Sequence, residues 1–273
     1  MPLRIANRRT DRVPIDFAGL TPESFRDRAL DDVRRTTLRR GNRDVELGDL
    51  FDVNGDAADL QWRLEGDWSA VHGLGAGMAA GEITVAGPIG RHAGAGMRGG
   101  RLEIYGNAGD HLGAEMRGGH IRVRGNAADY VGAAYQGSRS GMAGGTILIE
   151  GDAGSELGQR MRRGLIAVAG SVGPYVGMRM LAGSIFVFGN AGEHPGVGMR
   201  RGTIGLFGND RPTFLPTFRA GYRGQLPVLH LIEKQLHAAG LDVPRLRNLA
   251  GSIELFHGDL LELGRGEILL TAV

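Results

Sequence analysis

The sequence predicts an all-β protein, a parallel β-helix of about seven coils with 19 residues in each coil. Glycine contributes 48 of the 273 residues. This share is far above the usual value of about 7% and favours repeated turns. The chain repeats itself every 19 residues between Gly66 and Gly208. Each copy carries two apolar residues spaced two apart, which is the period of a β-strand.

Particular residue types recur at fixed positions of the repeat. Each copy begins with a glycine, at Gly66, Gly87, Gly106, Gly125, Gly151, Gly170 and Gly189. A methionine column comprises Met78, Met97, Met116, Met142, Met161, Met180 and Met199. A glycine follows three residues later, at Gly81, Gly100, Gly119, Gly145, Gly164, Gly183 and Gly202. Stacked coils about 4.8 Å apart would turn these columns into structural ladders.

The aliphatic pairs and the insertions complete the pattern. The pairs are Ile83/Val85, Leu102/Ile104, Ile121/Val123, Ile147/Ile149, Ile166/Val168, Ile185/Val187 and Ile204/Leu206. Glycines cut each copy into pieces too short for a helix, so we expect short strands joined by turns. The copy from Gly125 has seven additional residues around Gln136 to Arg139. Insertions in solenoids map to loops, and this segment should project from the coils.

Segments without the repeat flank the coils and predict caps, because bare strand edges at the ends of a solenoid would invite aggregation. The predicted divisions are an N-terminal cap over residues 1–65, the repeat over 66–208 and a C-terminal cap over 209–273. Thr21 and Pro22 predict the start of a short helix in the first cap.

The C-terminal cap should contain one helix and the final strands. Apolar residues recur at helical spacing in the stretch 226–239, which predicts a helix there. The stretch 251–256 repeats the pattern of a strand and predicts a last sheet-like coil. The stretch 264–270 is then expected to form an edge strand.

Composition excludes several classes of function. The chain has no cysteine, which removes disulfides, zinc fingers, iron–sulfur clusters and thiol nucleophiles. Its 32 basic residues nearly balance 30 acidic ones, so the charge does not predict nucleic-acid binding. The sequence shows neither a signal peptide nor an apolar stretch long enough to span a membrane. We therefore expect a cytoplasmic protein without membrane partners.

Two columns of polar residues are candidates for chemistry. One column could supply metal ligands, namely His92, His111, Tyr130, Glu156, Tyr175 and His194. Metal ligands must converge, whereas column neighbours stack in parallel, so we interpret the column as a polar and aromatic ladder. The other column is basic, with Arg98, Arg117, Arg162 and Arg200, and Arg163 and Arg201 beside it. It indicates a solvated surface, or a site for the carboxylates of a partner or of a polyglutamate-bearing cofactor.

No further catalytic constellation is evident. The segment GAGMRG from Gly94 matches the glycine pattern of dinucleotide-binding loops, but that motif needs a helix after it and a strand is expected here. The sequence also lacks nucleophile-elbow and phosphate-loop motifs. It therefore assigns no catalytic, cofactor-binding or metal-binding residue to this chain, and we expect no cofactor in it.

The outward face of the aliphatic strands predicts a partner surface. Side chains alternate along a strand, so the residues between and beside each aliphatic pair point outward. In the later coils this face becomes apolar, with Leu148, Leu165, Phe186, Phe188 and Phe207. Such a contiguous patch is typical of an interface. The alternative is that the C-terminal helix folds back and covers it.

The segments GAGMRGG (Gly94–Gly100) and GVGMRRG (Gly196–Gly202), with the recurrent GNAG, resemble the GXGXG-repeat β-helix family. This family includes the C-terminal domain of the glutamate synthase large subunit and the C subunit of formylmethanofuran dehydrogenase. The resemblance implies that the helix is right-handed, which the periodicity alone does not determine.

The ends of the chain resemble that C subunit, and in particular its homologue in the bacterial formyltransferase/hydrolase complex. The stretches 208–218, Leu20–Pro22 and Leu47–Phe51 carry this likeness. The resemblance implies a non-catalytic scaffold in a hetero-oligomer with amidohydrolase-like, dehydrogenase-B-like and formyltransferase subunits. Such a complex converts formyl-tetrahydromethanopterin to formate through a formylmethanofuran-type intermediate. The alternatives are an independent carbohydrate-acting β-helix enzyme and a stand-alone glutamate synthase domain.

Overall fold

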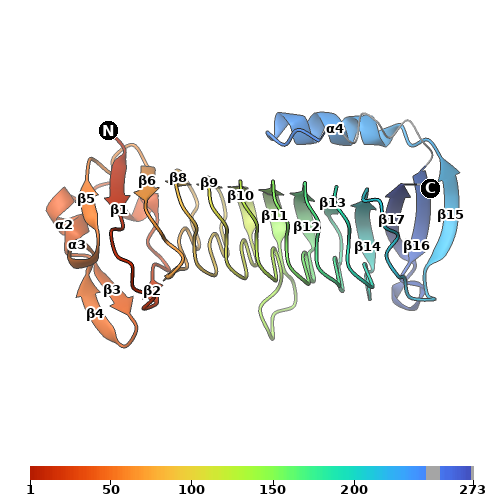
Figure 1. The fold of residues 1–273 in the computed structure, drawn as a ribbon, viewed down its shortest axis with the longest axis horizontal. Helices are drawn as coiled ribbons and strands as arrows, with labels where there is room; N and C mark the ends of the chain where they lie inside the picture. Colours follow the sequence, from red (N-terminus) through yellow and green to blue (C-terminus); the bar gives the residue numbers. More distant parts are fainter. Residues whose placement is uncertain (244–252, 272–273) are drawn as a thin grey trace.

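A computed structural model of the chain describes residues 1–243 and 253–271. It is mostly β-structure with few, short helices, which confirms the all-β class. The molecule is elongated, and its strands follow one another along the long axis (Figure 1). The strands are β1 (Leu3–Ala6), β2 (Ile15–Asp16), β3 (Thr37–Arg40), β4 (Arg43–Glu46), β5 (Asp52–Asn54), β6 (Gln61–Glu65), β7 (Val71–His72), β8 (Glu82–Val85), β9 (Arg101–Ile104), β10 (Arg117–Val123), β11 (Ala143–Ile149), β12 (Arg163–Val168), β13 (Ser184–Val187), β14 (Arg201–Leu206), β15 (Arg219–Gly224), β16 (Ile253–Gly258) and β17 (Arg265–Thr271). The helices are α1 (Pro22–Phe25), α2 (Leu30–Arg34), α3 (Leu47–Leu50), α4 (Val228–Ala238) and the 3₁₀ helix η1 (Leu260–Glu262).

Most strands belong to one large mixed sheet. Within the described residues it has 13 strands, in the order β15-β16-β17-β14-β13-β12-β11-β10-β9-β8-β6-β1-β5. From β6 to β14 each strand pairs in parallel with the strand of the next repeat. The aliphatic columns stay in register, so that Ile121 lies opposite Leu102 on one side and Ile147 on the other. Antiparallel pairs occur at the two ends, where β1 meets β5 and β16 meets both β15 and β17.

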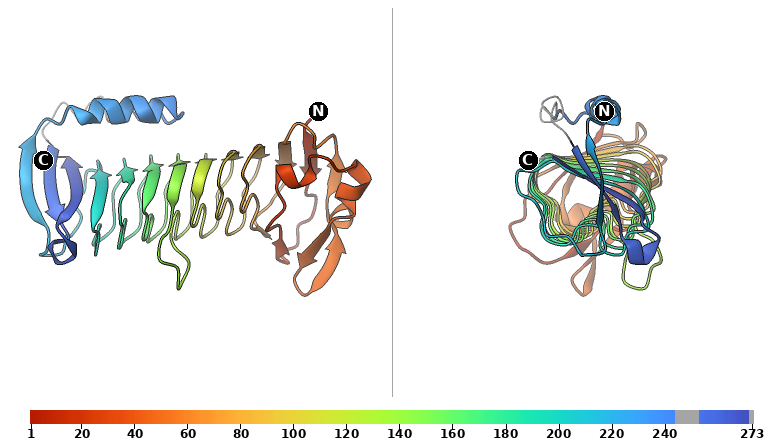
Figure 2. Two further views of the ribbon diagram at one scale, coloured as in Figure 1. Left: turned by 180° about the vertical axis from the view of Figure 1, so that it is seen from behind. Right: turned by 90° about the vertical axis from the view of Figure 1, so that its right-hand side faces the viewer.

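A second ladder joins the repeats away from the large sheet. It consists of single-residue parallel bridges between Trp68, Ile89, Ala108, Ala127, Ala153, Val172 and Ala191. Seen from the end, the repeats project onto nearly the same outline (Figure 2). Each repeat therefore contributes one strand to the large sheet and one residue to the second ladder.

The methionine and glycine columns fit together between neighbouring repeats. All seven methionines of the column are fully buried. A Cβ atom added to Gly119 would lie 2.8 Å from Cε of Met97 in the preceding repeat. Gly119 also has a φ of 90°, a left-handed conformation that glycine adopts at little cost. The glycine column thus permits a tight turn, and it also leaves room for the methionine of the preceding repeat.

The N-terminal segment continues the large sheet beyond the predicted boundary before residue 66. β6 pairs in parallel with β8 on one side and with β1 on the other. α1 begins where the sequence predicts, and the backbone N–H of Thr21 donates to Ser24 Oγ over 3.0 Å. Trp68 stacks on Phe51 with ring centroids 4.9 Å apart. These aromatic contacts close the first end of the stack.

The prediction that residues 264–270 form an edge strand is wrong. β17 lies inside the sheet, parallel to β14 and antiparallel to β16, and the sheet ends at β15. The sequence RGEILL of β17 resembles RGTIGL of β14, so Ile268 and Leu270 stack on Ile204 and Leu206 as another repeat would. The predicted last coil over 251–256 starts at residues outside the described ones, and β16 begins at Ile253.

α4 lies within the stretch 226–239 for which the sequence predicts a helix. It runs back from β15 along the stack, beside the strands of the later repeats (Figures 1 and 2). None of the helices in the described part of the chain combines the length and the hydropathy that crossing a membrane requires.

Candidate functional site

α4 covers the outer face of the later strands. Its Leu229 and Leu236 form a buried cluster together with Leu241 and Val243, which follow the helix. The five residues predicted as a partner interface lie in the same cluster, each at most 7% exposed, namely Leu148, Leu165, Phe186, Phe188 and Phe207. The structure thus corrects the exposed-surface assignment in favour of the intramolecular alternative. Packing the apolar helix face on the apolar sheet face removes both from water.

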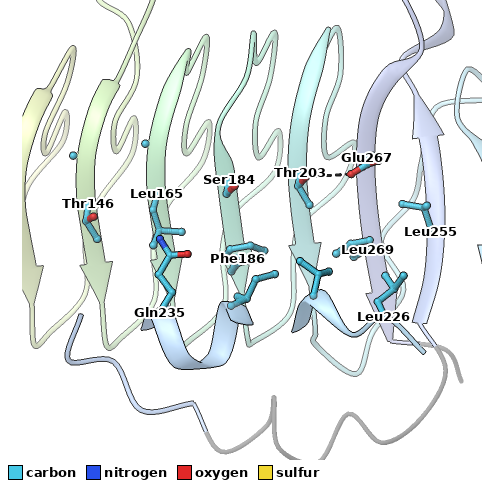
Figure 3. A pocket seen from close by; sticks show the side chains of 14 residues that line it. Thr146, Leu165, Ser184, Phe186, Thr203, Leu226, Gln235, Leu255, Glu267 and Leu269 are labelled. Atoms are coloured by element: carbon cyan, nitrogen blue, oxygen red, sulfur yellow. Dashed lines mark hydrogen bonds between the residues drawn. The ribbon is translucent and has the colours of Figure 1, made fainter. Parts of the chain in front are cut away.

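A cavity of about 610 Å³ remains between α4 and the sheet (Figure 3). Apolar side chains from both elements line it, including Leu165, Phe186, Leu226, Ile232 and Leu269. Hydroxyl-bearing residues of β11, β13 and β14 border it, namely Thr146, Ser184 and Thr203. Thr203 Oγ1 donates to Glu267 Oε2 over 3.3 Å. The cavity is suited to an apolar group with a hydrogen-bonding end.

The same outer face is charged in the earlier repeats. Arg122 donates to Glu150 Oε1 over 2.6 Å, and Arg124 donates to the same oxygen over 2.8 Å. Arg124 also pairs with Glu103 at 3.0 Å. These side chains are only partly exposed, so solvent screens the network less than it screens a surface pair. The predicted change from a charged to an apolar face is therefore present, and α4 covers the apolar part.

The predicted polar and aromatic column forms a stack of rings on another side of the repeats. His92 and His111 lie with ring centroids 5.2 Å apart, and His111 and Tyr130 with centroids 4.8 Å apart, in nearly parallel planes. Tyr135, from the insertion, packs against both histidines. All six column residues have φ between 56° and 66°. The rings of His92, His111 and Tyr130 lie in nearly parallel planes and do not converge on a common centre.

Burial controls the ionisation of this stack. It lowers the pKa of His92 and of His111 below the usual 6.5. The neighbouring His111 and nearby positive groups lower the pKa of His92 further. Burial also raises the pKa of Tyr135. The rings are therefore neutral near pH 7, and the stack is held by ring packing and hydrogen bonds.

In residues 1–243 and 253–271, no group of three or more histidine, aspartate or glutamate side chains is arranged to hold a metal ion. The glycine-rich segment from Gly94 leads into β9 and not into a helix, so it lacks the context of a dinucleotide-binding loop. This segment forms turns within one repeat.

Side chains from neighbouring repeats hold the insertion in place. Glu115 Oε1 accepts a hydrogen bond from the backbone N–H of Tyr135 over 3.1 Å. Arg160 donates to the carbonyl oxygen of Ser138 over 2.7 Å. Both Glu115 and Arg160 have a φ of 54°, where the equivalent position of another repeat is glycine, as at Gly96. The two residues with this unfavourable backbone conformation thus make the hydrogen bonds that hold the insertion.

The sequence analysis did not identify Glu115 and Arg160 as contacts of the insertion. It also did not single out Arg179, which occupies the same position in the repeat that follows that of Arg160. The available signal was a long charged residue standing where the glycine-rich pattern has glycine. The predicted basic column is exposed at Arg98, Arg117, Arg162 and Arg200. Among these four, Arg200 pairs with Glu262 at 3.0 Å.

Part of the chain is similar in sequence to known proteins. No family model matches the chain. The C subunit of the tungsten-containing formylmethanofuran dehydrogenase 2 of Methanothermobacter thermautotrophicus is 36% identical over 81 residues. The C subunit of the molybdenum-containing formylmethanofuran dehydrogenase 1 of Methanosarcina barkeri is 39% identical over 84 residues. These matches cover 28% and 29% of this chain, and only 30% and 28% of the length of those two relatives.

A solved structure matches the chain over nearly its full length. It is the X-ray crystal structure of the formyltransferase/hydrolase complex from Methylorubrum extorquens in complex with methylofuran. The match has a TM-score of 0.91 and 34% identity, and it covers 99% of this chain and 100% of the chain in that structure. The chain therefore belongs to the family that includes the C subunit of formylmethanofuran dehydrogenase and the matched chain of the formyltransferase/hydrolase complex.

Proposed function

We propose that this chain is a non-catalytic structural subunit of a formyltransferase/hydrolase complex. The observation that carries the proposal is the full-length correspondence with one chain of such a complex, at 34% identity and a TM-score of 0.91. Similarity over 100% of that chain leaves no part of it without a counterpart here. A shared architecture of this extent favours a shared place in an assembly.

The proposed form of the scaffold is a right-handed parallel β-helix of about seven coils, related to the GXGXG-repeat domain of glutamate synthase. The parallel register from β6 to β14 and the second ladder of bridges support this form. In a solenoid each coil contacts its neighbours, and the result is an extended surface along which several partners can be arranged. The extended shape of the stack (Figure 1) suits such a role.

The complex would transfer the formyl group of formyl-tetrahydromethanopterin to a methanofuran-type carrier and then hydrolyse it to formate. In this proposal the chemistry and its cofactors belong to amidohydrolase-like, dehydrogenase-B-like and formyltransferase subunits. The present chain would position them, in the cytoplasm, as part of one-carbon metabolism. The methylofuran bound in the related complex supports a furan-bearing carrier.

The full-length match favours this assignment over the two alternatives raised by the sequence, an independent carbohydrate-acting enzyme and a stand-alone glutamate synthase domain. The parallel stack of described rings at His92, His111 and Tyr130 also differs from the converging acid and base groups that a hydrolase needs. The scaffold role therefore accounts for the observations with the fewest additional assumptions.

The test is to purify the chain with an affinity tag from its source organism and to identify the co-purifying proteins by mass spectrometry. We expect a stable assembly that transfers and hydrolyses formyl groups, whereas the isolated chain does neither. An unrelated protein with the same tag serves as the control. Formyl hydrolysis by the isolated chain, or purification without partners, would overturn the proposal.

A further inference from the structure

Four arginines surround a cavity of about 370 Å³ beside the insertion. Arg139 comes from the insertion itself, and Arg160, Arg179 and Arg200 come from three consecutive repeats. Glu262 is the carboxylate in the lining, and it pairs with Arg200 at 3.0 Å. The guanidinium groups therefore outnumber the carboxylates on the wall of this cavity, which we call the arginine cavity.

Arg179 has a backbone conformation that an arginine seldom adopts. Its φ is 54°, and the equivalent position of the next repeat is Gly198, with a φ of 70°. Arg160 has the same φ, and its side chain donates a hydrogen bond to the carbonyl oxygen of Ser138 in the insertion. The side chain of Arg179 makes no ion pair with any residue in the described part of the chain. A strained arginine without an internal carboxylate indicates an external ligand.

The shape of the cavity indicates an extended ligand. The backbone N–H of Arg160 donates to Met178, and that of Arg179 donates to Val197, so their positions lie in adjacent rungs of one ladder. Rungs are about 4.8 Å apart, so the guanidinium groups are distributed along the stack. A second cavity of about 540 Å³ shares Arg160 and Arg179, and its other charged lining residue, Glu156, is held by Gln159. Arg160 and Arg179 therefore border two cavities, and each cavity also contains residues of the insertion.

We propose that the arginine cavity binds an extended acidic segment of a partner protein. Guanidinium groups pair with carboxylates through two parallel N–H···O bonds, and a row of them matches successive acidic side chains better than one small anion does. Arg139, Arg160 and Arg179 supply the contacts, while Arg200 remains paired with Glu262. This inference rests on the proposed scaffold function, since it names the partner chemistry that the scaffold recognises.

The test uses the full chain and a fluorescent oligo-aspartate peptide, with binding followed by fluorescence anisotropy at low salt. We expect Arg179→Gln to weaken binding roughly tenfold, because it removes a charge-assisted bidentate contact. The matched control is Arg98→Gln, which removes the same charge from the basic column far from the cavity. Arg179→Gly provides a second variant that removes the guanidinium group and suits the left-handed backbone, so it should bind weakly yet unfold at an unchanged temperature.

Equal weakening by Arg179→Gln and Arg98→Gln would overturn the inference in favour of nonspecific attraction. Complete displacement of the peptide by inorganic phosphate would overturn it in favour of a small-anion site, and failure of the unmodified chain to bind would also overturn it. Tagged Arg179→Gln, purified from the source organism, should lose one partner and retain the others. Loss of all partners from the unmodified chain would instead contradict the scaffold function itself.

Discussion

His92 Nδ1 lies 2.9 Å from the hydroxyl oxygen of Tyr135, a residue 43 positions later in the sequence. This contact joins the ring stack to the insertion, which also touches Glu115 and Arg160. The insertion is therefore fastened from the repeats on both sides of it. Because a partly buried imidazole takes part, the contact is sensitive to protonation.

The first prediction concerns the pH dependence of stability. Burial lowers the pKa of His72, His92, His111 and His120 below the usual 6.5. Below pH 6.5 the unfolded chain binds more protons than the folded chain. The contribution of these histidines to the free energy of unfolding is therefore fully present above pH 6.5 and is lost as the pH falls below that value. Thermal unfolding followed by circular dichroism should show a Tm that decreases between about pH 7 and pH 5.

Asp11 titrates in a different pH range and so can be separated from the histidines. The pKa of Asp11 is lowered from 3.8 to about 2 by hydrogen bonds from Arg9 and Arg40. Its contribution to stability is lost as the pH falls from about 4 toward 2, below the histidine range. Replacing His92 and His111 together by glutamine should reduce the slope of the Tm profile between about pH 7 and pH 5, and should leave the profile below about pH 4 unchanged. An unchanged slope in that variant would contradict the role of the stack.

The second prediction concerns the attachment of the insertion. Tyr135→Phe removes the hydroxyl that contacts His92 and should lower the free energy of unfolding by about 1 kcal/mol. It should also accelerate tryptic cleavage after Arg139, because the insertion opens more often. Tyr175→Phe is the control, since Tyr175 belongs to the column of His92 but packs against His194 and not against the insertion. Equal cleavage rates in both variants would refute the attachment.

The third prediction tests the aliphatic core. Ile121 is fully buried, and its Cδ1 lies 2.5 Å from where a Cβ of Gly94 would be. Ile121→Asp should lower the free energy of unfolding by more than about 4 kcal/mol, because it buries an unpaired charge. Ile121→Val, the matched control, should cost about 1 kcal/mol. Urea denaturation measures both values, and an unaffected Ile121→Asp variant would reverse the inward assignment of this strand.

The fourth prediction separates backbone strain from packing in the glycine columns. Gly119 and Gly96 both have positive φ, but an added Cβ meets Met97 only at Gly119 and meets nothing within 4 Å at Gly96. Gly96→Ala should cost about 1 kcal/mol from the backbone. Gly119→Ala should cost about 1–3 kcal/mol more, because Met97 and the backbone of Gly99 must move. Equal costs in urea denaturation would show that the methionine contact contributes nothing.

The fifth prediction concerns the cover provided by α4. Leu236 is fully buried against the sheet, whereas Leu231 on the same helix is 66% exposed. Leu236→Asp should detach α4 and expose Phe186 and its neighbours, while the stack keeps its far-ultraviolet spectrum. Increased binding of a hydrophobic dye and faster proteolysis of the helix would show this. Leu231→Asp should behave like the unmodified chain, and identical behaviour of the two variants would contradict the cover.

The 19-residue repeat was sufficient to predict that the strands stack on one another. Met97 and Gly119 belong to recurring columns, and each repeat pairs in parallel with its neighbours, so one 19-residue pattern predicts these contacts. The start of α1 at Pro22 and the extent of α4 likewise follow from short-range signals. Where a contact repeats along the chain, periodicity is sufficient to predict it.

Tertiary structure decided the contacts that do not repeat. The burial of Phe186 under α4 depends on how a single helix folds back, whereas the sequence favoured a partner surface at this position. The position of β17 between β14 and β16 depends on strand pairing across the chain end. The hydrogen bond from Arg160 to the carbonyl oxygen of Ser138 involves an insertion that occurs in a single repeat. These contacts follow from the three-dimensional path of unique segments, for which a repeated pattern contains no information.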